Sequence, residues 1–162
     1  MSILPRNRPD WTFINLCIVW IISLLSTCTR LHVGGLLWNP KTKQIVAIGY
    51  NGSPRGAPHC LDAGCEMEDG HCVRCLHCEQ NLLYWAGLAS QGCWMYLNYS
   101  PCRRCCNLIA QGGIKKVTYT IPYGNTGPVH EYLLSSGIQV GCYNIRMLSQ
   151  YLLKFVQEWC KL

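Results

Sequence analysis

The hydrophobic positions of the chain fall into short apolar runs that turn signals divide. Residues 11–29 form a long run without a charged side chain, which predicts a buried first helix. A membrane anchor is the alternative interpretation. Four polar residues interrupt the run, and it lies at the short edge of the roughly 17–25 residues that a spanning helix needs. We therefore expect a buried helix and no association with membranes.

Two further apolar runs, at residues 33–38 and 44–50, flank the turn signal Asn39-Pro40 and predict a β-hairpin. The next segment, residues 51–73, is rich in Gly, Pro and Cys, so it predicts a long loop without a regular element. Loops of this length are usually functional or held by a metal.

The rest of the chain alternates between strand and helix patterns. Strands are predicted at 94–98, 115–120 and 138–141, and helices at 77–87, 101–113, 129–136 and 147–159. Strands that are joined through helices pair mainly in parallel and are covered on both faces. The sequence therefore predicts one α/β domain over residues 1–162, a three-layer α/β/α sandwich. Its sheet is mixed and five-stranded, with an antiparallel first hairpin.

Composition excludes a disordered chain, because 49% of the 162 residues are apolar and only 14% are charged. The net charge of +6 agrees with an anionic ligand such as a nucleotide. The basic runs are too short for an arm that binds nucleic acid. The 13 cysteines are odd in number and gather beside histidines at residues 59–78 and 102–106, which favours metal binding over disulfides.

Two short stretches carry the candidate chemistry, and each stands at the predicted start of a helix. Residues 101–105 read PCRRC, so the thiolates of Cys102 and Cys105 fall on one face of a helical turn. The helix N-terminus lowers thiol pKa values, which favours metal binding. With His77 as a third ligand, a tetrahedral zinc keeps one open position, as in catalytic sites.

Glu79 lies two residues beyond His77, where it can reach a water at that open position without binding the metal. Zinc lowers the pKa of water to about 7, and a nearby carboxylate moves the proton to a leaving group. The order H-x-E…P-C-x-x-C is the signature of zinc nucleobase deaminases. A lone C-x-x-C is more often a structural zinc or redox half-site. The prediction of a catalytic zinc site therefore depends on finding both motifs together in this order. We interpret Cys78 and Cys106 as packing residues.

Most of the chain resembles the deoxycytidylate (dCMP) deaminase family of the cytidine deaminase superfamily. The HCEQN and SPCRRC segments alone would also fit tRNA adenosine, riboflavin-pathway or guanine deaminases. The GYNGSP loop and the cysteine-rich insert before His77 point to the nucleotide branch. The segments that carry the resemblance are residues 28–30, 33–34, 49–54, 59–60, 64–65, 70–72, 74, 77–81, 100–102 and 105.

The resemblance implies a cytoplasmic hydrolase that converts dCMP into dUMP and ammonia in pyrimidine nucleotide biosynthesis. It implies a catalytic zinc on His77, Cys102 and Cys105, with Glu79 as the proton carrier. It also implies a homohexamer, activation by dCTP, and inhibition by dTTP with Mg²⁺.

The resemblance further implies that Asn51 and Gly52 of the GYNGSP loop contact the substrate. A second, structural zinc would take Cys28, Cys60 and His71, with Cys65 or Cys72 as its fourth ligand. A substrate phosphate requires a cation, and among the nearby charges Arg30 and Arg74 lie inside family-like segments.

Some positions depart from the family pattern. The family usually has Ala where Cys78 stands and Thr where Cys75 stands, and its first helix is less bulky than here. The departures at Cys17, Trp20 and Ile21 are consistent with a helix buried between subunits.

Two other functions stay open. A non-catalytic zinc module would have no use for Glu79. A deaminase of another cytosine or adenine substrate, such as a nucleoside or nucleic acid, would need a basic groove for a nucleic-acid strand.

Overall fold

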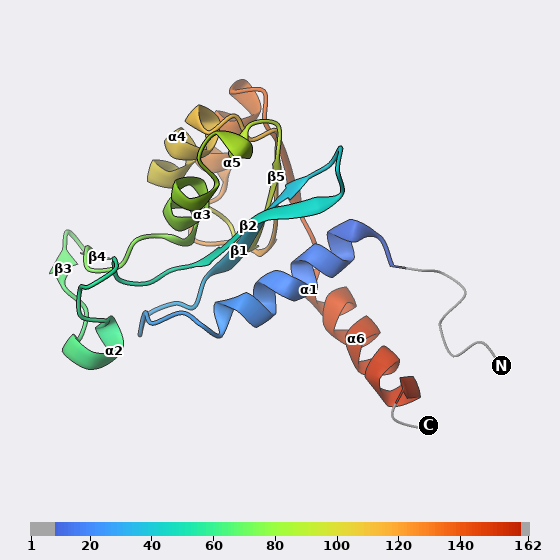
Figure 1. Cartoon of the computed structure of the whole chain (residues 1–162), viewed down its shortest axis with the longest axis horizontal. Helices are drawn as coiled ribbons and strands as arrows, with labels where there is room; N and C mark the ends of the chain where they lie inside the picture. Colours follow the sequence, from blue (N-terminus) through green and yellow to red (C-terminus); the bar gives the residue numbers. More distant parts are fainter. Residues whose placement is uncertain (1–8, 160–162) are drawn as a thin grey trace.

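The fold is built on one five-stranded mixed sheet (Figure 1). The structure is a computed structural model, and it describes residues 9–159. The strand order is β2-β1-β5-β6-β7, and β1 runs antiparallel to both neighbours while β5, β6 and β7 are parallel. The expected antiparallel hairpin and mixed sheet are confirmed. The strands are β1 (Gly34–Asn39), β2 (Gln44–Tyr50), β5 (Trp94–Tyr99), β6 (Lys116–Ile121) and β7 (Gln139–Cys142).

Helices cover both faces of this sheet, as the alternation of strands and helices predicts. On one face α1 (Trp11–Ser23) packs beside α6 (Ile145–Trp159), with the Phe13 and Tyr151 rings 4.7 Å apart. The other face is covered by α3 (Cys78–Ala86), α4 (Arg103–Gln111) and α5 (Gly127–Ser135). In β5 Tyr96 faces α1, whereas Met95 and Leu97 face α3 and α4. The three-layer sandwich is thereby confirmed.

The first helix is shorter than its apolar run. It ends at Ser23, and residues 24–33 continue as turns and irregular backbone instead of helix. The Leu24 and Leu25 amides bond to carbonyls three residues back, which tightens and ends the helix. After the helix ends, hydrogen bonds to other parts of the chain hold this segment, such as those from Ser26 Oγ to Asn51. The helix predicted at 11–29 was therefore too long. Among the described helices, none combines the length and the apolar character that crossing a bilayer requires.

The cysteine-rich loop also contains short elements that its composition did not predict. They are α2 (Cys60–Ala63) and an antiparallel pair, β3 (Met67–Glu68) and β4 (His71–Cys72). These elements have two to four residues each, which is too short to leave a periodic pattern. A short 3₁₀ helix, η1 (Gly87–Ser90), extends α3. In Figure 1 the insert with α2, β3 and β4 lies beyond one end of the sheet, away from α6.

Candidate active site and metal centres

The three predicted catalytic ligands come from the N-termini of two neighbouring helices. His77 is the N-cap of α3, and its backbone amide donates a hydrogen bond to Gln80 Oε1 at 2.7 Å. Cys102 is the N-cap of α4, and Cys105 lies in the first turn of the same helix. Pro101 therefore precedes the helix and does not occupy its first turn.

The ligand atoms of this trio lie at distances that suit a tetrahedral zinc. His77 Nδ1 is 3.5 Å from Cys102 Sγ and 3.4 Å from Cys105 Sγ. Typical Zn–N and Zn–S bonds in a tetrahedron place such atoms about 3.6 Å apart. All three ligand atoms lie within 4.8 Å of one another, and Glu79 is not part of this group. The residues present therefore fit a three-ligand zinc site.

The electrostatics of the trio also favour a cation. A hydrogen bond from the Cys105 thiol, with further help from His77, lowers the pKa of Cys102 to about 3. Cys105 keeps its proton, because its bond to the Cys102 thiolate and its burial raise its pKa. The site thus presents one thiolate and a second thiol that loses its proton on binding a metal.

Glu79 is buried next to these ligands. Its side chain is 4% exposed, and burial raises the pKa of its carboxyl to about 7. A carboxyl with such a pKa can both accept and release a proton at neutral pH, as a general acid–base group must. Its position therefore matches the expected role of a proton carrier that does not bind the metal.

A cavity of about 210 Å³ opens over the site. It brings together His77, Glu79 and Cys102 with the predicted substrate residues Asn51 and Arg30. Several further residues of the cavity wall were not predicted as substrate residues from the sequence; they are Leu31, Val33, Tyr99, Ser100 and Tyr123. Tyr99 and Ser100 stand directly before Pro101-Cys102, so their sequence position could have indicated them. Tyr123 follows β6 and is brought to the cavity by the fold alone.

Asn51 lies in the cavity wall with most of its polar groups already engaged. Its Oδ1 accepts hydrogen bonds from Ser26 Oγ at 2.6 Å and from the Val33 amide at 2.8 Å. Its Nδ2 donates to the Leu31 carbonyl at 2.7 Å. An amide nitrogen carries two N–H groups, so one stays free for a ligand.

The other predicted substrate residues are placed differently. Arg30 lines the cavity, where its guanidinium donates to the Gly70 carbonyl at 3.0 Å. Arg74 does not line it, because its side chain pairs with Glu66 at 3.4 Å and donates to the Gly64 carbonyl. Gly52 lies in the wall of a second cavity. The cavity therefore gathers Arg30 and Asn51 but leaves out Arg74 and Gly52.

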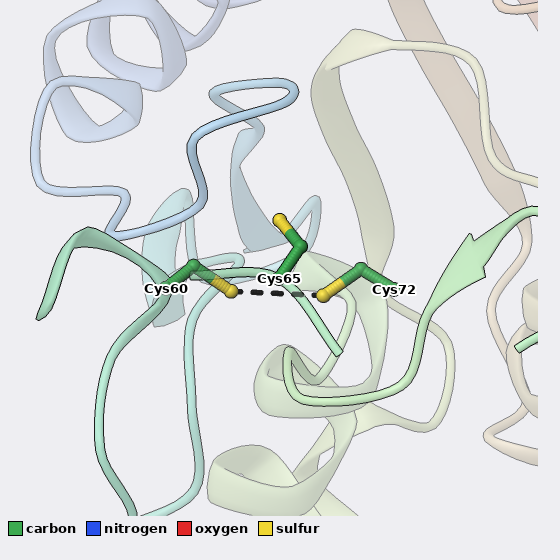
Figure 2. Close-up of side chains that lie close together, drawn as sticks. All are labelled: Cys60, Cys65 and Cys72. Carbon is green, nitrogen blue, oxygen red and sulfur yellow. Dashed lines mark hydrogen bonds between the residues drawn. The ribbon is translucent and has the colours of Figure 1, made fainter. Parts of the chain in front are cut away.

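A second group of thiols gathers where α2 and β4 meet the segment after α1. Cys60, Cys65 and Cys72 have sulfurs within 4.8 Å of one another. Figure 2 shows the sulfurs of Cys60 and Cys72 facing each other, 3.6 Å apart. Cys28 and Cys75 are buried in the same cluster, and Cys75 Sγ lies 3.3 Å from Cys60 Sγ. Tetrahedral zinc–thiolate sites place sulfurs about 3.8 Å apart, so the donor set fits a metal.

This cluster is richer in cysteine than the predicted ligand set. Cys75 was noted only as a departure from the family pattern, although its C-x-x-C spacing from Cys72 was a signal for a ligand. The side chain of His71, the predicted histidine ligand, lies outside the described part of the structure.

Two thiols beside the catalytic ligands are packing residues, as expected. Cys78 and Cys106 are fully buried, and their Sγ–H groups donate to the carbonyls of Gly49 and Cys102. Burial raises the pKa of Cys106 to about 11, which keeps this thiol neutral. Neither residue belongs to the metal-ligand group.

A three-layer sandwich that presents one histidine and two cysteines at helix N-termini, beside a buried carboxyl, defines a zinc-dependent hydrolase of the cytidine deaminase fold. Solved structures with this fold include RibD from Acinetobacter baumannii, with a TM-score of 0.63, 19% identity and coverage of 87% of this chain and 37% of that one. At this identity the likeness concerns the fold alone.

Comparison of sequences gives the family. The model of the cytidine and deoxycytidylate deaminase zinc-binding region matches residues 11–121, so the chain belongs to this family. The ComE operon protein 2 of Bacillus subtilis is 36% identical over 137 residues, covering 83% of this chain and 71% of that protein. The deoxycytidylate deaminase of Schizosaccharomyces pombe is 32% identical over 85% of this chain, which spans 45% of that longer protein.

A solved structure with a bound nucleotide also resembles this chain. The dCMP deaminase of cyanophage S-TIM5, in complex with dCMP and dUMP, matches with a TM-score of 0.71 and 31% identity. The match covers 85% of this chain and 100% of that one.

Proposed function

We propose that this protein hydrolyses dCMP to dUMP and ammonia. The observation that carries the proposal is the three-ligand group of His77, Cys102 and Cys105. Two of its members, His77 and Cys102, line one cavity with the buried carboxyl of Glu79, which is outside the ligand group. The family and the likeness to a dCMP deaminase that binds dCMP and dUMP support the choice of substrate.

In this mechanism His77, Cys102 and Cys105 would hold zinc, which would supply a Lewis acid that makes water reactive near neutral pH. Glu79 accepts a proton from the water that attacks C4 of the cytosine ring. It passes this proton to the ring nitrogen N3, takes a second proton from the hydroxyl that has added at C4, and gives it to the amino group, which leaves as ammonia. Burial by the cavity walls keeps the carboxyl of Glu79 able to hold and release the proton.

The remaining cavity residues define where the nucleotide would lie. We place the substrate phosphate against Arg30, because a guanidinium has five N–H donors and only part of this set is engaged. Asn51 would offer its free N–H to the sugar. Arg74 braces the insert through Glu66 in this structure, so we expect a smaller effect from its removal than from that of Arg30.

Ammonia release from dCMP, deoxycytidine, dCTP and a short single-stranded oligonucleotide tests the proposal. We expect turnover of dCMP and little turnover of the oligonucleotide. Arg30→Ala should reduce the preference for dCMP over deoxycytidine, whereas Arg74→Ala should change it less. Turnover of the oligonucleotide or of an adenine or guanine substrate, without turnover of dCMP, would contradict the proposal.

A second, structural zinc in the cysteine cluster extends the proposal. Four thiolates from Cys28, Cys60, Cys65, Cys72 and Cys75 can close a tetrahedral site, which would pin an insert with few apolar contacts of its own. Metal analysis of the purified protein should give two zinc ions per chain. One zinc per chain, lost in a Cys102→Ser variant, would rule out the second site.

Regulation, assembly and location stay predictions from the resemblance. The second cavity, with Arg55 over the exposed Trp85 ring at 5.5 Å, offers a cation and an aromatic face to a nucleotide effector. Rate measurements with added dCTP, and with dTTP and Mg²⁺, test the effectors. Light scattering tests the hexamer, and cell fractionation tests the cytoplasmic location.

A further inference from the structure

The segment between α1 and β1 forms one wall of the active-site cavity. Cys28, Arg30, Leu31 and Val33 of this segment line the cavity, although its backbone is neither helix nor strand. Without the regular hydrogen bonds of an element, such a wall depends on side chains of other elements for its position.

Asn98 of β5 fixes the end of this wall nearest the sheet. Its Nδ2 donates to the His32 carbonyl at 2.9 Å, and its Oδ1 accepts from the Gly34 amide at 3.0 Å. The two bonds bracket Val33, so they set the backbone on both sides of a cavity residue. Asn98 is fully buried and does not itself line the cavity.

The strand that carries Asn98 also leads to the catalytic turn. Cys102 follows Asn98 by four residues, and the Asn98 carbonyl accepts a bond of 2.6 Å from Thr120 Oγ1. Ser100, between them, also lines the cavity, and its Oγ accepts a hydrogen bond of 2.7 Å from the amide of Tyr123, a further wall residue. The end of β5 therefore connects two parts of the cavity wall to the predicted metal ligand Cys102.

We infer that Asn98 is a positioning residue of the substrate site, which keeps Arg30 and its segment at a set distance from the Cys102 turn. The inference rests on the proposed function, because it assigns Arg30 to the substrate phosphate. Asn98 acts through the wall and has no contact with the reacting atoms. Its loss should therefore weaken binding of the nucleotide and leave the zinc ligands and Glu79 in place.

Asn98→Leu tests this role, because leucine has a similar volume and no hydrogen-bonding atoms. We expect KM for dCMP to rise about tenfold while kcat changes less than about threefold and the zinc content is retained. Asn15→Leu is the matched control, since Asn15 is equally buried but lies in α1 and does not line the cavity. It should leave KM unchanged.

A double-mutant cycle connects Asn98 to Arg30. Arg30→Ala is introduced into the wild type and into Asn98→Leu, and the factor by which it raises KM is compared between the two. If Asn98 acts by placing Arg30, this factor should be less than half as large in Asn98→Leu as in the wild type. Equal factors in both backgrounds would overturn the inference. A fall in kcat with constant KM, or an equal rise of KM in Asn15→Leu, would also overturn it.

Amide hydrogen exchange gives a readout that does not depend on the substrate. Exchange at residues 28–34 should quicken in Asn98→Leu, while residues 103–111 of α4 keep their protection. If the leucine variant does not fold, Asn98→Ser replaces it, because serine leaves room for a bridging water. Asn98→Ser should show the same pattern of exchange more weakly. Unchanged exchange at 28–34 refutes the positioning role, whereas absence of dCMP turnover in the wild type refutes only the proposed function.

Discussion

At the scale of single residues, the proposed function assigns metal binding and proton transfer to separate groups. His77, Cys102 and Cys105 lie together, while the carboxyl of Glu79 is buried beside them and outside the ligand group. The two functions can therefore be removed independently by substitution.

Glu79→Gln should retain zinc and lose activity. Glutamine has the shape of glutamate but cannot carry the proton, and general acid–base groups typically contribute about 10²- to 10⁴-fold to the rate. Zinc analysis and ammonia release on the same preparation measure both outcomes. As a control, Cys78→Ala removes the neighbouring buried thiol and should keep activity within a few-fold. Loss of zinc from Glu79→Gln would show that the carboxyl is a ligand after all.

The raised pKa of the Cys17 thiol predicts that the stability of the protein depends on pH. Burial is the main cause that raises the pKa of this α1 thiol from 9.0 to about 11. Between these pH values the unfolded chain releases the thiol proton and the folded chain keeps it, so the free energy of unfolding falls as pH rises. Denaturant titrations at pH 8 and pH 10.5, under reducing conditions, should show a smaller fall for Cys17→Ala than for the wild type. Equal falls would contradict the shifted pKa.

At the scale of elements, the close approach of α1 to β1 positions the segment that becomes the cavity wall. A Cβ added at Gly34 would lie 2.3 Å from the Val19 carbonyl oxygen and 2.5 Å from the Ser23 amide nitrogen. Both atoms belong to the backbone of α1, so no side-chain rotation can relieve the clash.

Gly34→Ala should therefore destabilise the protein by about 1–3 kcal/mol, the usual cost of overpacking. Thermal or denaturant unfolding measures this effect. Gly127→Ala in α5 is the control, because its Cβ would meet only Asn125 Oδ1 at 3.4 Å, and its stability should change little. A Gly34→Ala variant as stable as the wild type would mean that α1 moves freely relative to the sheet.

At the scale of the whole molecule, the cysteine cluster and the catalytic centre share one cavity. Cys28, Cys72 and Cys75 of the cluster line the cavity that also contains His77 and Glu79. A metal in the cluster would consequently hold the substrate wall as well as the insert.

Cys60→Ser should bind one zinc fewer per chain and melt at least about 5 °C lower, because metal binding contributes to folding. It should also raise KM for dCMP, since the wall beside Arg30 loosens. Cys93→Ser is the matched control, because Cys93 is also a buried thiol but lies in the core between the sheet and α3, α4 and α5. This variant should keep its full zinc content. An unchanged zinc content in Cys60→Ser would contradict a metal at the cluster.

Much of this architecture could be predicted because local patterns carry it. Short apolar runs indicate the strands. The motifs around His77 and Cys102 lie at the starts of helices, where the helix dipole and the spacing of side chains depend only on residues close in the sequence. Such signals need no knowledge of distant residues. The predicted metal ligands His77, Cys102 and Cys105 and the predicted proton carrier Glu79 come from such local motifs.

The sequence by itself therefore determined the layers of the fold and predicted the metal-ligand trio and the proton carrier. Only the tertiary structure decided the end of α1 at Ser23, the place of Cys75 in the thiol cluster, and the separation of Arg30 from Arg74. It also placed Asn98 behind the wall residue Val33 and brought Tyr123 into the wall of the cavity. These features depend on contacts between residues far apart in the chain, and no local period or spacing records such contacts.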